Sequence, residues 1–215
     1  MKQIDIGAEL EKGWNLFKPN MGILIVAGLI DTLVSVVTCL ILAGPLSAGI
    51  FLIVRRLLEN DPAKPQAGDV FKGLDLFVQA LLVFLITMVC SMLISLVLTR
   101  IPVFGNLAGM ALSLAVSSVM MWAMMFVAYE KRTATDALKK VFDALKTGEF
   151  TMPFIFGVIA SLIANLGIFA CGVGVFFTMP FAYCMMACCY QTLYGDEAYV
   201  IEPQVIPPPP ADLRL

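Results

Sequence analysis

Long apolar runs without charge constrain this fold more than any other feature of the chain. Asp31 is the only charged residue between positions 21 and 54, and residues 76–99 contain none. A helix needs about 20 apolar residues to cross the hydrocarbon core of a bilayer, so runs of this length are typical of membrane spans. The composition agrees, with 60% hydrophobic and 14% charged residues. The sequence predicts a helical membrane protein with no sizeable soluble domain.

Hydropathy and turn residues predict six transmembrane helices. The expected spans are residues 21–42, 44–58, 76–99, 107–128, 153–171 and 175–194. Gly44-Pro45 and the segments RIPVFGN and CGVG are interpreted as the turns inside three hairpins. The predicted fold class is therefore all-α, a polytopic bundle over residues 21–194. It follows an N-terminal segment, residues 1–20, and precedes a proline-rich tail, residues 195–215, interpreted as a solvated end rather than a docking peptide.

The second predicted span is short. Fifteen residues reach about 22 Å along a helix, which is less than a hydrocarbon core of about 30 Å. Arg55 and Arg56 stand at its end, where long basic side chains can extend to the headgroups. This interpretation is favoured over a re-entrant segment.

A short amphipathic stretch precedes each predicted hairpin. The three stretches are GAELEKGWNLFKPN, AGDVFKGLDLF and ATDALKKVFDALKTGEF. Ile6, just before the first of them, and Leu10, Trp14 and Phe17 within it recur at helical spacing, while Glu9 falls outside that apolar stripe. The pattern predicts three copies of one unit, each with an interfacial amphipathic helix before its hairpin.

Basic residues define the expected orientation. Every Lys and Arg except Arg100 falls on the same side of the six predicted spans. The positive-inside rule then places both termini and the amphipathic segments in the cytoplasm. Candidate contacts to lipid headgroups are Arg55, Arg56, Lys131, Arg132, Lys139 and Lys140. Solvated loop ends are the alternative interpretation of these residues.

The run GPLSAGIFLIVRRLLENDPAKPQAGDVFKGLDLF and the opening GWNLFKPNMG carry a family resemblance. Across residues 10–195 the chain resembles bacterial six-helix membrane families labelled as domains of unknown function. Some of these are grouped with the membrane domains of glycerophosphodiester phosphodiesterases. The resemblance implies a bacterial cytoplasmic membrane location. It carries over no phosphodiesterase catalytic domain and no catalytic motif.

The residues that most enzymes use are scarce in this sequence. There is no His, which removes the commonest general base and the usual zinc sites. Cys184, Cys188 and Cys189 lie at helical spacing and are interpreted as packing residues. A copper(I) path through the sulfur-rich patch Met120, Met121, Met124 and Met125 is the alternative. We expect no enzyme activity, metal or cofactor, and the net charge of −2 argues against nucleic acid.

Asp31 is the one acid near the middle of a predicted span. A charged carboxylate at that depth costs about 2.5 to 3.5 kcal/mol on insertion scales, so we expect Asp31 to face inward. Thr87 and Asn165 occupy comparable depths in the other two hairpins. Two functions follow from these residues. The favoured one is a non-enzymatic scaffold or assembly factor that binds membrane lipid, a protein partner or a second copy of itself. The alternative is a small proton- or cation-linked transporter or channel that uses Asp31.

Overall fold

The computed structural model describes residues 4–98, 104–148, 150–169 and 174–198. Within these ranges the chain forms seven α-helices, one 3-10 helix and no strand. The elements are α1 (Ile6–Val37), α2 (Ala43–Leu58), η1 (Ala67–Leu76), α3 (Phe77–Leu98), α4 (Phe104–Glu130), α5 (Ala134–Lys146), α6 (Thr151–Phe169) and α7 (Val175–Ala198). The all-α prediction is confirmed.

Three described segments are long and apolar enough to cross a membrane. They are Ile6–Val37, Ala67–Leu98 and Ala108–Glu130, and a fourth is added if the sharply bent pair α5 and α6 counts as one span. The protein is therefore a helical membrane protein. Length and composition support fewer than the six predicted spans: α2 has only 16 residues, and α7 is not among the helices that qualify.

The N-terminal segment and the first span form one continuous helix, whereas the sequence predicted a boundary near residue 20. Asp5 caps α1 by accepting a hydrogen bond from the Gly7 N–H at 2.9 Å. The helix then passes through Pro19, which cannot donate a backbone hydrogen bond. Next to this proline, the Asn20 side chain donates to the Leu16 carbonyl at 2.8 Å. The proline therefore lies within the helix without ending it.

The turn between α1 and α2 lies earlier than predicted. It occupies residues 38–42, where Cys39 and Leu40 have φ values of 50° and 67°. Gly44 and Pro45, which the sequence pattern indicated as the break, belong to the first turn of α2. Proline is tolerated there because the first amides of a helix have no intrahelical partner.

The other two amphipathic stretches form η1 and α5. At the start of η1, Gln66 and Asp69 make a reciprocal capping box, and Thr133 caps α5 by accepting from the Asp136 N–H. The helix α2 matches its predicted span within one residue. Most of the predicted RIPVFGN and CGVG turns, and the tail, lie outside the described residues.

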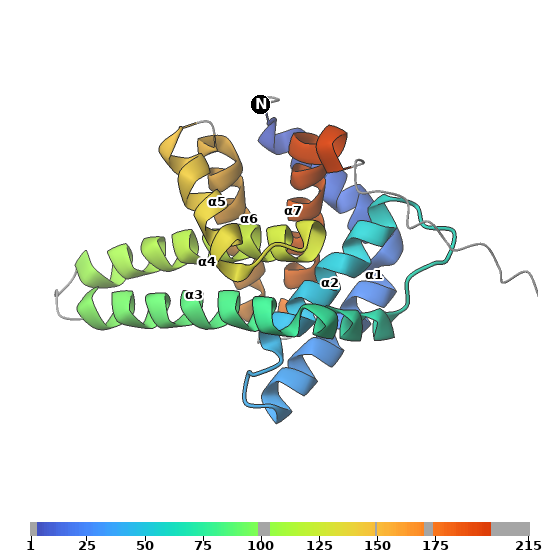
Figure 1. Ribbon diagram of the computed structural model, residues 1–215, viewed down its shortest axis with the longest axis horizontal. Coiled ribbons are helices and arrows are strands. Elements are labelled where there is room, and N and C mark those ends of the chain that lie inside the picture. Colours follow the sequence, from blue (N-terminus) through green and yellow to red (C-terminus); the bar gives the residue numbers. More distant parts are fainter. Residues whose placement is uncertain (1–3, 99–103, 149, 170–173, 199–215) are drawn as a thin grey trace, which may run out of the picture.

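The helices form a packed group from which one hairpin extends. In Figure 1, α3 and α4 run side by side along the longest axis and reach beyond the other elements. The helix α1 packs on α7 and α2, while α4 also contacts α6 and α5. The core therefore lies where the second half of α4 meets α2 and α7.

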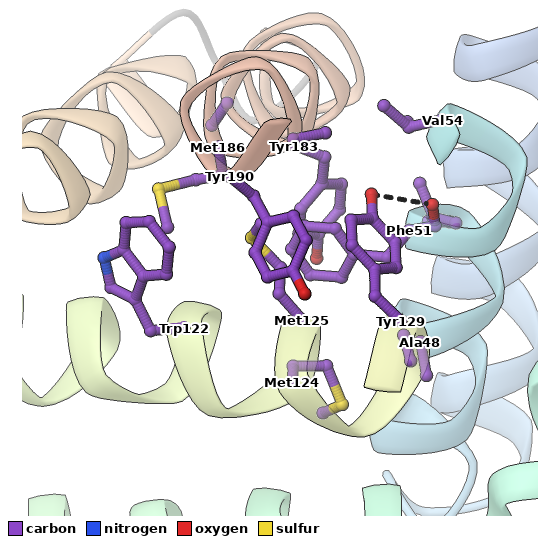
Figure 2. Packing of buried hydrophobic residues seen from close by; sticks show 14 of the residues in the cluster. Ala48, Phe51, Val54, Trp122, Met124, Met125, Tyr129, Tyr183, Met186 and Tyr190 are labelled. Atoms are coloured by element: carbon purple, nitrogen blue, oxygen red, sulfur yellow. Dashed lines mark hydrogen bonds between the residues drawn. The ribbon is translucent and has the colours of Figure 1, made fainter. Parts of the chain in front are cut away.

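Aromatic and methionine side chains fill this core (Figure 2). Every residue from Trp122 to Tyr129 of α4 is buried. The Tyr129 hydroxyl donates to the Phe51 carbonyl at 3.1 Å, which connects α4 to α2. Trp122 Nε1 donates to the Pro153 carbonyl at 3.1 Å, which connects α4 to α6. Each buried polar atom of these two rings thus has a partner on another helix.

Two glycines bring η1 directly onto α2. A Cβ at Gly73 would lie 2.0 Å from the Pro45 carbonyl oxygen, and one at Gly49 would lie 1.8 Å from that of Val70. Real side-chain atoms do not approach a backbone so closely. Both positions therefore require glycine for the backbones to meet.

Candidate functional site

Asp31 lies on the face of α1 that packs against the protein. The buried residues of this helix are Glu9, Gly13, Phe17, Leu24, Ala27 and Ser35. Asp31 falls between Ala27 and Ser35 at four-residue spacing and is partly buried. Its Oδ1 accepts a hydrogen bond from the Ser35 hydroxyl at 3.2 Å. The carboxyl group therefore has a partner one turn later on its own helix.

Polar side chains of two other helices lie near this carboxyl group. Tyr183 of α7 is within electrostatic range of Asp31 and lies near Ser47 of α2. The Ser47 hydroxyl itself donates to the Ala43 carbonyl at 2.7 Å. Ser35, Ser47 and Tyr183 are all nearly inaccessible to solvent. We name Asp31, Ser35, Ser47 and Tyr183 the Asp31 cluster. It joins α1, α2 and α7 through polar groups within an otherwise apolar core.

A proline faces α1 one turn before Asp31. A Cβ at Gly28 would meet the Pro180 ring of α7 at 3.5 Å, which is ordinary van der Waals contact. Pro180 lies inside α7 and leaves one carbonyl of that helix without its usual amide donor. Interruptions of this kind recur next to binding sites in transporters.

Thr87 and Asn165 lie apart from the Asp31 cluster. The Thr87 hydroxyl donates to the Val83 carbonyl at 2.8 Å, and the Asn165 side chain donates to the Ser161 carbonyl at 2.7 Å. Both bonds stay within the residue's own helix. Thr87 is buried on α3 and Asn165 is exposed on α6. The three polar residues predicted at comparable depth therefore do not converge.

Thr87 instead lines an open groove between α3 and α4. The groove has a volume of about 670 Å³, and four serines contribute to its wall: Ser91, Ser95, Ser113 and Ser117. These serines were not predicted as a site, although their four-residue spacing places each pair on one helix face. Small polar residues at this spacing commonly permit close helix packing in membranes.

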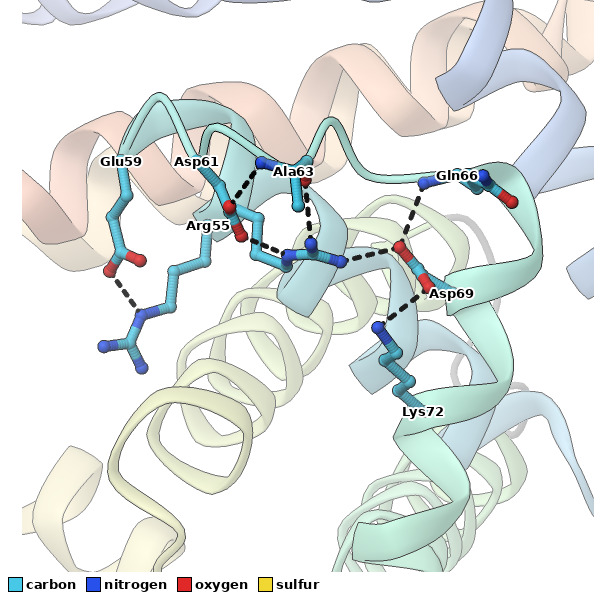
Figure 3. Close-up of polar contacts among 8 residues, drawn as sticks. Arg55, Glu59, Asp61, Ala63, Gln66, Asp69 and Lys72 are labelled. Carbon is cyan, nitrogen blue, oxygen red and sulfur yellow. Dashed lines mark hydrogen bonds and ion pairs between the residues drawn. The ribbon is translucent and has the colours of Figure 1, made fainter. Parts of the chain in front are cut away.

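Arg56 belongs to an internal ion cluster (Figure 3). Its three guanidinium nitrogens donate to Asp61 at 2.8 Å, to Asp69 at 2.7 Å and to the Ala63 carbonyl at 2.8 Å. The hydrogen bond from Arg56, followed by that from the Ala63 N–H, lowers the pKa of Asp61. The guanidinium therefore ties the end of α2 to the connection that leads into η1.

Three other candidate headgroup contacts are also engaged within the protein. Arg55 pairs with Glu59 at 2.7 Å and donates to the Tyr129 carbonyl at 3.1 Å. Lys140 pairs with Glu130 at 2.7 Å, and Arg132 pairs with the same carboxylate. Glu130 also accepts from the Tyr190 hydroxyl at 2.9 Å. These cations hold the ends of the helices together.

Lys131 and Lys139 differ from the other four. Both are exposed, and neither forms an ion pair with the residues that the structure describes. Lys131 follows α4 with a φ of 53°, while Lys139 lies on the outer face of α5. Of the six predicted headgroup contacts, these two have ammonium groups that remain free to meet an anion.

Glu9 is a functional candidate that the sequence pattern missed. Predicted on the polar side of an interfacial helix, it is only 2% exposed, because that side packs on α7. Its Oε1 accepts from Lys12 at 2.7 Å and from Thr192 at 2.8 Å, whereas Oε2 has no partner among the described residues. Gly13 could have indicated from the sequence that this face is covered, because a glycine there allows Met185 of α7 to pack against the same face of α1.

Most of the sulfur-containing residues singled out in the sequence lie in the core, and Met120 and Met121 are partly buried at its edge. Cys184, Cys188 and Cys189 are free thiols buried on α7, and Met124 and Met125 are buried on α4. The described part of the chain places no group of three or more His, Cys, Asp or Glu residues where they could hold a metal ion. The positions of the cysteines and methionines match those of packing residues.

Comparison with protein-family models, with curated proteins and with solved structures gives no match. Any function assigned to the chain therefore rests on its own geometry.

Proposed function

We propose that this chain is a non-enzymatic membrane scaffold or assembly factor that binds membrane lipid and a protein partner, either a second copy of itself or another membrane helix. The α3–α4 hairpin carries this proposal. It extends beyond the other helices (Figure 1), and exposed apolar side chains continue along α3 from Val78 to Val97. Within a bilayer this surface is available to lipid and to other helices.

The arrangement in three hairpins is part of the same proposal. The pairs α1–α2, α3–α4 and α6–α7 are each in contact, and an amphipathic segment precedes each pair: the first turns of α1, then η1, then α5. This repetition supports six membrane-embedded helices, with α2 as a short helix held at one end by Arg55 and Arg56. The positive-inside rule supports cytoplasmic termini, and the family resemblance supports a bacterial cytoplasmic membrane.

The positions of the polar residues support a scaffold over a conduit. Asp31, Thr87 and Asn165 are each bonded within their own helix and lie on three different helices. A polar path through a bundle needs such groups to face one another. Catalysis likewise needs a base, nucleophile or metal cluster placed together.

Photo-crosslinking from α3 tests the scaffold. A photoreactive residue at Val89, which is 53% exposed, should capture a protein neighbour in native membranes. The matched position Val83 is fully buried on the same helix and should give only crosslinks within the chain. Adducts to lipid alone at Val89 would contradict a protein-binding scaffold.

A proton- or cation-linked transporter is the second candidate, favoured by the Asp31 cluster beside Pro180 of α7. Flux into liposomes tests it. If the scaffold proposal holds, wild type and Asp31→Asn show the same background flux. Flux that depends on the protein, and that Asp31→Asn removes while the exposed control Asp75→Asn retains it, would support the transporter instead.

A further inference from the structure

We propose that a pocket between α1 and the α2–η1 connection binds the phosphodiester headgroup of a phospholipid. The pocket has a volume of about 670 Å³ and lies between residues 19–23 of α1 and residues 56–65. It deepens the proposed function, because it names a lipid site on the scaffold, and it rests on the membrane location of that proposal.

The pocket lies where two helices change from apolar to polar sequence. Its α1 side is formed at Pro19, Asn20 and Ile23, where the apolar run of that helix begins. Its other side begins where α2 ends, at Leu57. Both helices cross from apolar to polar sequence at this level. In a bilayer the pocket therefore lies at the depth of the headgroups.

The pocket has one positively charged side chain that no carboxylate of the described residues neutralises. Arg56 and Asp61 line the pocket but satisfy one another, since Arg56 donates to Asp61 and the second Asp61 oxygen accepts from the Ala63 N–H at 2.9 Å. Lys64 is exposed on the pocket wall and forms no ion pair with the described residues. One free positive charge matches one phosphodiester, which carries a single negative charge.

Two asparagine side chains line the pocket together with Lys64. Asn60 lines the pocket and its side chain makes no hydrogen bond with the described part of the chain, while Asn20 commits only its Nδ2. The Asn60 amide can donate to a phosphate oxygen while Lys64 neutralises it. The backbone of Asn60 has a φ of 50°, so the residue holds a conformation that asparagine adopts more readily than most others.

One wall of the pocket is apolar. Gly22, Ile23 and Leu57 form it, and a Cβ at Gly22 would meet no atom within 4 Å. The polar and apolar walls together fit an amphiphile better than a free anion. The first acyl carbons of a phospholipid would lie along Gly22 and Ile23.

Native mass spectrometry of the purified, delipidated full-length chain tests the site, with phosphatidylglycerol and phosphatidylethanolamine as probes. Lys64→Gln should weaken retention of the first bound phospholipid by about threefold to tenfold, the loss expected for one charge-assisted hydrogen bond at a partly hydrated site. Gly22→Leu should weaken it without touching any charge, because the new side chain occupies the apolar wall. The control Lys146→Gln removes an exposed lysine that lies outside the pocket and is not among the candidate headgroup contacts, and it should leave retention unchanged.

Three results would overturn the site. Equal losses in Lys64→Gln and Lys146→Gln would mean general attraction of anions to a basic surface. Full competition by inorganic phosphate would mean a free-phosphate site rather than a phospholipid site. Unchanged retention in both Lys64→Gln and Gly22→Leu would mean that lipid binds elsewhere. The crosslinking at Val89 reports on the scaffold separately, so failure of the pocket and failure of the proposed function are distinguishable.

Discussion

Gly73 is one of two glycines whose replacement the contact between η1 and α2 does not accommodate. Its missing side chain allows η1 to touch the backbone of α2, with the Pro45 carbonyl 2.0 Å from where a Cβ would lie. We expect Gly73→Ala to lower the free energy of unfolding by about 1–3 kcal/mol, because the two backbones must separate. Thermal unfolding in detergent measures the loss.

Gly68 provides the matched control, since it lies in the same 3-10 helix and a Cβ added to it would meet no atom within 4 Å. Gly68→Ala should change stability by less than about 0.5 kcal/mol. Equal losses in the two variants would mean that alanine disturbs the 3-10 helix itself rather than its contact with α2.

Asp61 gives the ion cluster a defined response to acid. Its pKa is lowered by the hydrogen bond from Arg56, so the ionised form favours the folded connection. This contribution is present above the ordinary Asp pKa of about 4 and is lost as the pH falls through the lower value in the folded protein. We expect the protection factors of the amides in residues 59–66, which correct for the intrinsic pH dependence of hydrogen exchange, to be lower at pH 3 than at pH 7.

Asp61→Asn separates this carboxylate from Asp69, whose pKa is also lowered, first by the hydrogen bond from the Gln66 N–H. The variant should show lower protection factors in residues 59–66 already at pH 7 and a smaller change on acidification. A pH response as large as that of wild type would assign the effect to Asp69 instead.

Trp122 connects α4 to α6 and tests how the core holds its helices together. Its indole is fully buried and donates to the Pro153 carbonyl at 3.1 Å. Trp122→Phe removes this bond and leaves unfilled volume, so the free energy of unfolding should fall by about 1–3 kcal/mol. Unfolding in a denaturing detergent measures it. Trp14→Phe, at a side chain that is 39% exposed, should cost less.

The helices were predictable where the apolar run and its turn signals agree. The helix α2 and the segments η1 and α5 begin within one residue of their predicted starts. Capping residues such as Thr133 mark the starts of η1 and α5. The exceptions involve proline. Pro45 indicated a break, yet it lies in the first turn of α2, where its missing amide would have had no intrahelical partner. The boundary expected near residue 20 is likewise absent, because α1 continues through Pro19.

The candidate site was predictable only in its local part. Ser35 follows Asp31 by one helical turn, so their contact is implicit in the sequence. Tyr183 and Ser47 were not predictable, because hydropathy does not specify which helices pack together. Glu9 was misplaced for the same reason: its polar character indicated solvent, whereas α7 covers that face of α1.

The orientation of the whole chain in the membrane is the remaining prediction, and two positions test it. Cys39 is exposed in the turn between α1 and α2, and Asn60 is exposed just beyond the other end of α2. If α2 crosses the membrane and the termini are cytoplasmic, a membrane-impermeant maleimide should label Cys39 in intact cells. A cysteine introduced by Asn60→Cys should react only after permeabilisation. Each position is tested in a variant whose other cysteines are replaced by serine.

Labelling of both positions from the same side would mean that α2 is re-entrant. Labelling of Asn60→Cys alone in intact cells would mean that the basic residues face the opposite side of the membrane. If α2 spans the membrane, Arg55 and Arg56 lie at the cytoplasmic surface. Their ion pairs with Glu59 and Asp61 then fix the cytoplasmic end of this short helix at the membrane surface.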